Sequence, residues 1–99
     1  MLSCCLAEFL GTTLFLTVIA KYGGDQYGMY AICIALLAAI FFMGSKGFPG
    51  NFNPAVTLMQ FMQQGMTEKS MTDAMCKVGG QVAGALAAWK LAEVKMGDF

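Results

Sequence analysis

Long stretches without charged side chains constrain the fold of this chain more than any other feature of its sequence. Residues 26–45 contain no charged side chain, and residues 2–20 contain only Glu8. A hydrocarbon core about 30 Å thick is crossed by about 20 helical residues that rise 1.5 Å each. The spacing of the charges therefore predicts two transmembrane helices, at about 2–20 and 27–45, with a short glycine-containing turn between them.

A third uncharged stretch, residues 47–67, is also long enough to span a bilayer, but glycine and proline interrupt its first half. Proline lacks the backbone N–H that a helix interior needs, so this first half cannot be helical. Asn53 is a favoured N-cap and Pro54 a favoured first helical residue, which predicts a helix from Pro54 to Gln63. Ten helical residues cover about 15 Å, half of a bilayer. We therefore expect residues 47–64 to form a re-entrant loop and half-helix.

The last expected helix, at about 72–91, has an uncharged interior of only twelve residues between Lys77 and Lys90. It spans a bilayer if these two lysines extend their ammonium groups toward the two interfaces. Gly80 and Gly84 form a G-x-x-x-G pattern, and small residues at this spacing let helix backbones pack closely in lipid. We therefore expect a third transmembrane helix that packs tightly against a neighbour.

The composition excludes several classes of protein. Only 12% of the residues are charged, against about 25% in soluble domains, so a soluble helical bundle with an apolar surface is the weaker alternative. Zero net charge without arginine argues against nucleic-acid binding. The sequence lacks histidine, the usual general base and the commonest transition-metal ligand. We expect no enzyme activity, no cofactor and no metal site, and a single unit, residues 1–99, that forms an all-α, multi-pass integral membrane protein in a lipid bilayer.

Four cysteines, Cys4, Cys5, Cys33 and Cys76, follow neither a metal-binding spacing nor the pattern of a disulfide framework. Three of them lie inside apolar runs, where a thiol behaves as a small hydrophobic side chain. We therefore expect free thiols that serve only in packing.

The lysines do not indicate an orientation in the membrane. With three spans and one re-entrant loop, three lysines would lie on the amino-terminal side and three on the other, so a positive-inside bias is absent. The first group is Lys46, Lys69 and Lys77, and the second is Lys21, Lys90 and Lys95. The chain has either a weak preference or inserts both ways.

Two polar residues stand out within the expected membrane segments. The side-chain oxygen of Asn53 can cap the half-helix, which turns its NH₂ group outward as a donor at the positive end of the helix dipole. Such a group disfavours cations and can orient the oxygen of water or of a hydroxyl group. Glu8 is a costly charge within a span, and it can accept hydrogen bonds from the broken loop, residues 47–53. The alternative is that Glu8 lies at the membrane interface near the start of the chain.

These motifs together resemble the first repeat of the aquaporin and aquaglyceroporin (major intrinsic protein) family. Residues 53–57 (Asn-Pro-Ala-Val-Thr) are similar to the family's first signature. Residues 7–12 (Ala-Glu-Phe-Leu-Gly-Thr) resemble its opening helix, and Gln81 with Gly84 and Ala85 resembles its third helix. The order and spacing agree over nearly the whole chain, which implies half of an aquaporin-like fold.

The resemblance implies a role for each matching residue. Glu8 would brace the re-entrant loop, and Asn53 would donate hydrogen bonds to permeating molecules. Pro54 and Ala55 would contact a second half-helix. The carbonyl groups of Pro49, Gly50 and Asn51 would line one vestibule. The residues implied to pack the third helix are Gly80, Gln81, Gly84 and Ala85.

Three departures from the family pattern limit what the resemblance implies. Family members carry two inverted repeats in one chain, whereas this sequence holds one. The residues Phe48-Pro49-Gly50-Asn51 replace a loop that typically reads Ser-Gly-Gly-His. The arginine and histidine of the family's narrow filter belong to the missing half, so selectivity between water and glycerol does not follow.

Two functions from different classes remain. The first is a channel subunit for passive transport of water or small neutral solutes, whose pore needs a second half from another copy or another chain. The second is a non-conducting partner, truncated or regulatory, of a full-length channel.

Overall fold

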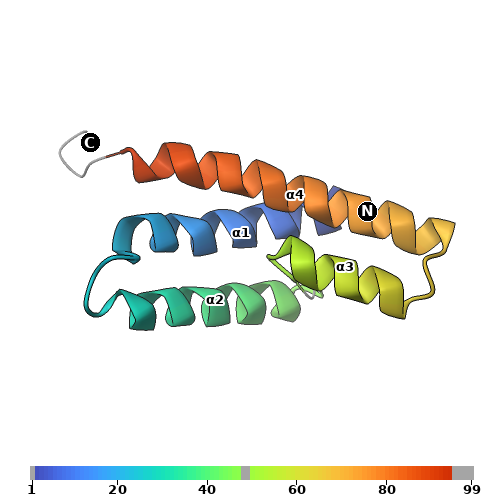
Figure 1. Cartoon of the computed structure of the whole chain (residues 1–99), viewed down its shortest axis with the longest axis horizontal. Coiled ribbons are helices and arrows are strands. Elements are labelled where there is room, and N and C mark those ends of the chain that lie inside the picture. The colour runs from blue at the N-terminus through green and yellow to red at the C-terminus, as the bar shows by residue number, and fades with distance from the viewer. Residues whose placement is uncertain (1, 48–49, 95–99) are drawn as a thin grey trace.

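The computed structural model describes residues 2–47 and 50–94, and within these residues the chain is entirely helical, with four α-helices and no strand (Figure 1). The helices are α1 (Leu2–Tyr22), α2 (Gly28–Ser45), α3 (Pro54–Gln63) and α4 (Glu68–Ala92). The expected all-α class is confirmed. The helix predicted from Pro54 to Gln63 is also confirmed, with Asn53 as its N-cap and proline at its first position.

Helices α1 and α4 form the long axis of the bundle, where they lie side by side and run in the same direction (Figure 1). Helix α2 returns along α1 in the opposite direction. The short helix α3 lies beside the first half of α4 and runs opposite to it (Figure 1). The bundle is therefore built on a parallel pair of long helices, with α2 and α3 added beside it.

Two glycines of α4 permit the close approach of α1. A Cβ atom built on Gly84 would lie 2.9 Å from the carbonyl oxygen of Phe9 and 2.9 Å from the Cβ of Thr12. A Cβ atom built on Gly80 would overlap the carbonyl oxygen of Cys5. Real side chains do not tolerate such distances, so the G-x-x-x-G pattern of α4 faces α1 and sets the spacing of the pair.

The expectation of four free cysteines is wrong, because Cys5 of α1 and Cys76 of α4 form a disulfide, with their Cα atoms 5.3 Å apart. The two residues are separated by 71 positions in sequence. The parallel packing of α1 on α4 brings them face to face, and spacing along the chain does not carry that information. Cys4 and Cys33 are free.

Helix α4 begins four residues before the expected start at residue 72. The side chain of Thr67 accepts a hydrogen bond from the backbone N–H of Ser70 at 3.2 Å and caps the helix there. The resulting helix has 25 residues. The local cap, rather than the onset of the apolar pattern, therefore determines where α4 begins.

Two helices in the described part of the chain are long and apolar enough to cross a membrane. They are Ser3–Tyr22, with mean hydropathy 1.7, and Gly28–Ser45, with mean hydropathy 2.1. Helix α4 is not among them. The expectation of three spans is thus met by length and composition for the first two helices only.

The interior and the surface of the bundle have unusual compositions. The largest fully buried side chains are those of Glu8, Thr12 and Thr57, all of them polar. Large apolar side chains are exposed on every helix, with Leu37 at 67% and Phe41 at 76%. The bundle therefore places polar groups at its centre and apolar groups outside.

Candidate functional site

The carboxylate of Glu8 is the centre of a buried polar network. Its Oε2 accepts a hydrogen bond from the backbone N–H of Asn51 at 2.9 Å, and its Oε1 accepts one from the backbone N–H of Phe52 at 2.8 Å. A third bond comes from Nε2 of Gln81 to Oε1 at 3.1 Å. Glu8 is only 1% exposed, so three donors replace the water that a carboxylate needs.

The network continues from α4 into α3 through the hydroxyl of Thr57. Nε2 of Gln81 donates to Oγ1 of Thr57 at 2.8 Å, and Nδ2 of Asn51 donates to the same oxygen at 3.0 Å. Nδ2 of Asn51 also donates to Oε1 of Gln60 at 2.9 Å. The side chains of Glu8, Gln81 and Thr57 thus tie α1, α4 and α3 to the loop before α3.

Asn53 lies at the start of α3, with its side chain exposed. Its Oδ1 accepts a hydrogen bond from the backbone N–H of Ala55 at 2.9 Å, which caps the helix and fixes the plane of the amide. The amide nitrogen has no hydrogen-bond partner among the described residues and remains available as a donor. Pro54 and Ala55 are exposed beside it, so the start of α3 presents an open surface.

The start of α3 lies beside the middle of α4, away from both of its ends. Gln81 is one residue past the centre of the 25-residue helix, and it contacts Thr57 in the first turn of α3. In Figure 1, α3 accordingly begins about half-way along α4 and ends near the start of α4. The short helix therefore covers only one half of the length of the long pair.

Phe52 holds the loop between Glu8 and the helix start in an uncommon conformation. Its φ of 55° lies in the left-handed region, which is unfavourable for a bulky side chain. The ring is 3% exposed and fills the space that Gly11 and Gly50 leave open, since a Cβ atom on either glycine would overlap it. The two bonds of the loop to Glu8 and the burial of the ring stabilise this conformation.

The remaining predicted site residues occupy different positions. Gly50 lies against the ring of Phe52, and the Asn51 side chain points into the polar network. Ala85 lines a cavity next to Asn53. Pro49 lies outside the described residues, so the expected row of carbonyl groups is placed only in part.

Sequence reasoning missed several residues of the network. Thr57 and Gln60 lie three positions apart on one face of α3, and with Gln63 they are the polar side chains of a helix that is otherwise apolar, which is a detectable signal. Thr12 is buried at 2% exposure one turn after Glu8 but lies outside the network, because its Oγ1 has no hydrogen-bond partner among the described residues. Nothing in the sequence indicated the left-handed conformation of Phe52.

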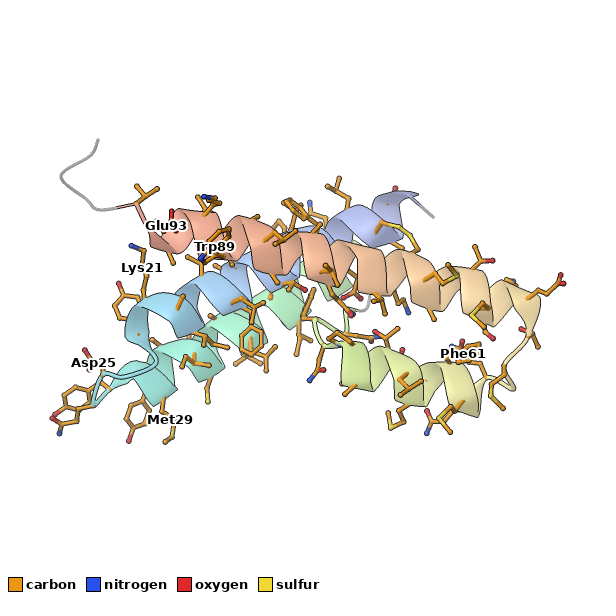
Figure 2. The ribbon with its side chains drawn as sticks, turned by 45° about the horizontal axis from the view of Figure 1, so that its top comes forward. Lys21, Asp25, Met29, Phe61, Trp89 and Glu93 are labelled. Atoms are coloured by element: carbon orange, nitrogen blue, oxygen red, sulfur yellow. A yellow bond between two sulfur atoms is a disulfide. The ribbon has the colours of Figure 1, made fainter. Side chains whose placement is uncertain are left out.

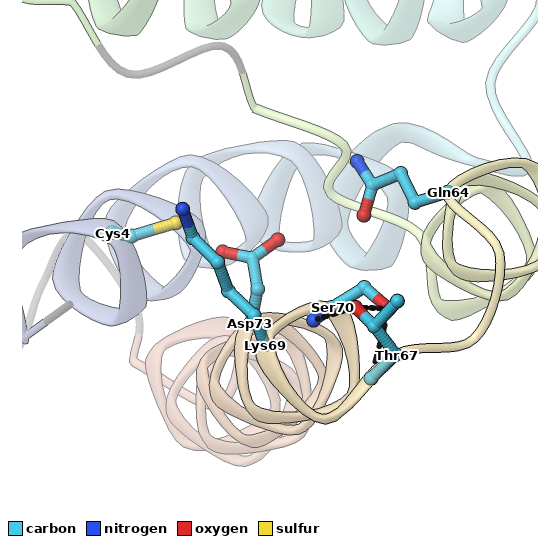
Figure 3. Close-up of a pocket in the computed structure, with 6 residues that line it drawn as sticks. All are labelled: Cys4, Gln64, Thr67, Lys69, Ser70 and Asp73. Carbon is cyan, nitrogen blue, oxygen red and sulfur yellow. Dashed lines mark hydrogen bonds between the residues drawn. The ribbon is translucent and has the colours of Figure 1, made fainter.

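A second, more polar cavity of about 480 Å³ lies where α3 ends and α4 begins (Figure 3). Its lining residues are Cys4, Gln64, Thr67, Lys69, Ser70 and Asp73. Thr67 and Ser70 hydrogen-bond to each other and cap α4, as the dashed lines of Figure 3 show. These two hydroxyl groups therefore have a structural role in the helix start.

Within residues 2–47 and 50–94, no group of three or more acidic, cysteine or histidine side chains is placed to hold a metal ion. No known protein family, curated protein or solved structure matches this chain.

Proposed function

We propose that this chain is a multi-pass integral membrane protein that forms half of an aquaporin-like channel for water or small neutral solutes. The pore is completed by a second half, contributed by another copy or another chain. The sequence motifs centred on Glu8, Asn53 and Gln81 support the likeness to this family, and the geometry of α3 supports the function.

The exposed apolar surface supports a lipid environment. Only 22% of the apolar window of α1 and 17% of that of α2 is buried within the chain. A core helix of a soluble protein would be mostly buried, and large exposed apolar surfaces mark sites of membrane or protein interaction. Lipid acyl chains cover such a surface without further protein.

A third span formed by α4 is part of the proposal. Its 25 residues extend about 37 Å at 1.5 Å per residue, which exceeds the thickness of a bilayer core. Lys77 forms an ion pair with Asp73 at 3.1 Å, which lowers the cost of a charge near one interface. At the other end, Trp89 and Glu93 lie at the end of α4 and Lys21 lies at the end of α1, where its Nζ donates to the carbonyl oxygen of Val94 at 2.7 Å (Figure 2); this composition suits the opposite interface.

The observation that carries the proposed function is the position of the exposed Asn53 amide beside the middle of α4. In a bilayer crossed by α1, α2 and α4, this amide lies near mid-depth. The loop before it enters the membrane and α3 leaves on the same side. An oriented N–H donor at the positive end of a helix dipole attracts the oxygen of a neutral solute and disfavours a cation.

The exposed surface of Asn53, Pro54 and Ala55 is where a second half-helix completes the pore. Two copies inserted in opposite orientations bring two such surfaces together at the centre of the membrane. The equal distribution of lysines over the two sides is compatible with insertion both ways.

The test is osmotic shrinkage of liposomes that contain the purified chain. We expect faster shrinkage than in empty liposomes, and a loss of this gain in Asn53→Ser, because serine retains the helix cap but lacks the amide donor. Gln63→Ser, at the exposed far end of α3, is the matched control and should conduct like the native chain. Permeability equal to that of empty liposomes, with insertion confirmed by flotation, would reject transport by this chain alone.

The second candidate function is a non-conducting partner of a full-length channel. The observation that favours it is that the described residues contain one half-helix, and that the sequence has no arginine or histidine for a filter. Crosslinking to a longer aquaporin-like chain, without crosslinking between copies of this chain, would support the partner over the self-assembled channel.

A further inference from the structure

A groove on the outer surface of the bundle lies between the start of α1 and the end of α2. Its volume is about 250 Å³, and its lining residues are Ser3, Leu6, Ala7, Leu10, Phe42, Met43 and Lys46. The side chains of Leu6, Leu10 and Phe42 are about half exposed, so the described part of the chain leaves them partly uncovered. This α1–α2 groove is therefore open to whatever surrounds the bundle.

The polar residues of the α1–α2 groove lie at one end of it. Because α1 and α2 are antiparallel, Ser3 in the first turn of α1 lies at the same end of the pair as Lys46, which directly follows α2 (Figure 1). The apolar lining continues along α1 to Leu10, seven positions after Ser3. This distance is about 10 Å along a helix, out of roughly 15 Å for one leaflet of a bilayer core. The groove thus changes from polar to apolar in the direction of the membrane interior.

Lys46 supplies a positive charge at the polar end. Its Nζ lies 5.6 Å from the centre of the Phe42 ring, which is also part of the groove lining, and this contact holds the ammonium group beside the groove. Lys77 and Lys90 each form an ion pair with a carboxylate, whereas Lys46 forms none in the described part of the chain. The charge of Lys46 is therefore available to an anion.

Two other cavities of the bundle lack this combination of features. In the polar cavity of Figure 3, the lining includes Asp73 as well as Lys69, so the cavity offers no excess of positive charge. The lining of an apolar cavity between α3 and α4, of about 490 Å³, includes no charged residue. The α1–α2 groove differs from both because one unpaired cation lies at the end of an apolar surface.

We propose that the α1–α2 groove binds an anionic phospholipid. Its phosphate group accepts hydrogen bonds from the ammonium group of Lys46 and the hydroxyl of Ser3. One acyl chain covers the apolar side chains of Leu6, Leu10 and Phe42. Free phosphate would leave these side chains uncovered, and a neutral amphiphile would leave the charge of Lys46 unpaired. The proposal rests on the membrane location in the proposed function, and it does not depend on transport.

The experiment is a lipid titration of the full chain in detergent micelles, with binding measured by native mass spectrometry. The two lipids are phosphatidylglycerol and phosphatidylcholine with identical acyl chains. We expect the native chain to bind phosphatidylglycerol about fivefold more tightly, which is the effect of one lysine near an anionic surface. Glycerol phosphate, which has the anionic group without the chains, should not compete with phosphatidylglycerol.

Three variants test the role of Lys46. Lys46→Gln should remove the preference for phosphatidylglycerol, whereas Lys46→Arg should retain it, because a guanidinium group also binds phosphate. Lys69→Gln is the matched control, since it removes an exposed lysine on the same expected side of the membrane, and it should bind both lipids like the native chain.

Three results would overturn the proposal. The first is equal affinity of the native chain for the two lipids, and the second is an equal loss of preference in Lys46→Gln and Lys69→Gln, which would indicate attraction by net charge alone. The third is a chain found only as lipid-free dimers, which would mean that a second copy covers the groove. A chain that binds phosphatidylglycerol without conducting contradicts only the proposed function, and a conducting chain without lipid preference contradicts only this site.

Discussion

Replacement of Glu8 by glutamine tests the network on which the loop before α3 depends. The carboxylate accepts three hydrogen bonds, two at Oε1 and one at Oε2. The glutamine side chain has only one oxygen. If this oxygen accepts the hydrogen bonds from Phe52 and Gln81, the NH₂ group of the glutamine must face the backbone N–H of Asn51. Two donors then face each other, and the Asn51 N–H loses its acceptor.

The expected loss follows from these contacts. An unpaired backbone N–H at this site costs about 1–3 kcal/mol, and exchange of a charged acceptor for a neutral one weakens each of the other two bonds by about 1 kcal/mol. Relief from burying a charge offsets part of that loss. We therefore expect Glu8→Gln to lower the free energy of unfolding by about 2–4 kcal/mol.

Two measurements check this expectation. The midpoint of unfolding in mixed micelles should fall, and the amide hydrogens of Asn51 and Phe52 should exchange faster than in the native chain. Glu93→Gln makes the same chemical change at an exposed site, where the ion pair with Lys90 is 3.9 Å long, and it should shift stability by less than about 0.5 kcal/mol. If Glu8→Gln behaves like this control, the carboxylate does not hold the loop.

Three further predictions concern packing, capping and the disulfide. Gly84→Ala should destabilise the chain by about 1–3 kcal/mol, because the added Cβ would collide with the backbone of α1. Gly79→Ala is the control, since a Cβ there has nothing within 4 Å, and it should be neutral or slightly stabilising. Comparison of the unfolding midpoints of the two variants tests this prediction. Asn53→Ala should cost about 1 kcal/mol through loss of the cap, whereas Asn53→Ser should keep most of that stability, as thermal unfolding will show. The native chain should change its electrophoretic mobility on reduction, and Cys5→Ser should abolish that change. The same variant should lower the free energy of unfolding by up to about 4 kcal/mol, because the link to Cys76 closes a loop of about 70 residues. A mobility change that persists in Cys5→Ser would mean that the two cysteines are not joined.

The parts of the fold that depend on local signals could be predicted from the sequence. The spacing of charges located α1 and α2, and the pair Asn53 and Pro54 located the first residue of α3. The predicted start of α4 at residue 72 is too late, because the apolar pattern begins several residues after the cap at Thr67. Local hydrogen-bonding chemistry sets helix ends, whereas hydropathy reports only helix interiors.

The parts that depend on which helices meet could not be predicted from local signals. The disulfide requires α1 and α4 to be parallel and in register, and the spacing of Cys5 and Cys76 does not encode this. At the candidate site, the charge of Glu8 within an apolar run indicated a buried partner, and the loop supplies two backbone donors to it. The left-handed backbone of Phe52 had no signal, since a phenylalanine gives no hint of a positive φ.

The polar interior explains how such an apolar chain can specify one arrangement of its helices. In the proposed lipid setting, apolar side chains gain little by leaving acyl chains for one another, so apolar contact does not select among helix pairings. Close packing at Gly80 and Gly84 sets the distance between α1 and α4. The hydrogen bonds of Glu8, Gln81 and Thr57 set their register, because a shift of one turn would leave a buried carboxylate without donors. The same bonds fix where α3 begins, so the residues that determine the fold also position the amide of Asn53.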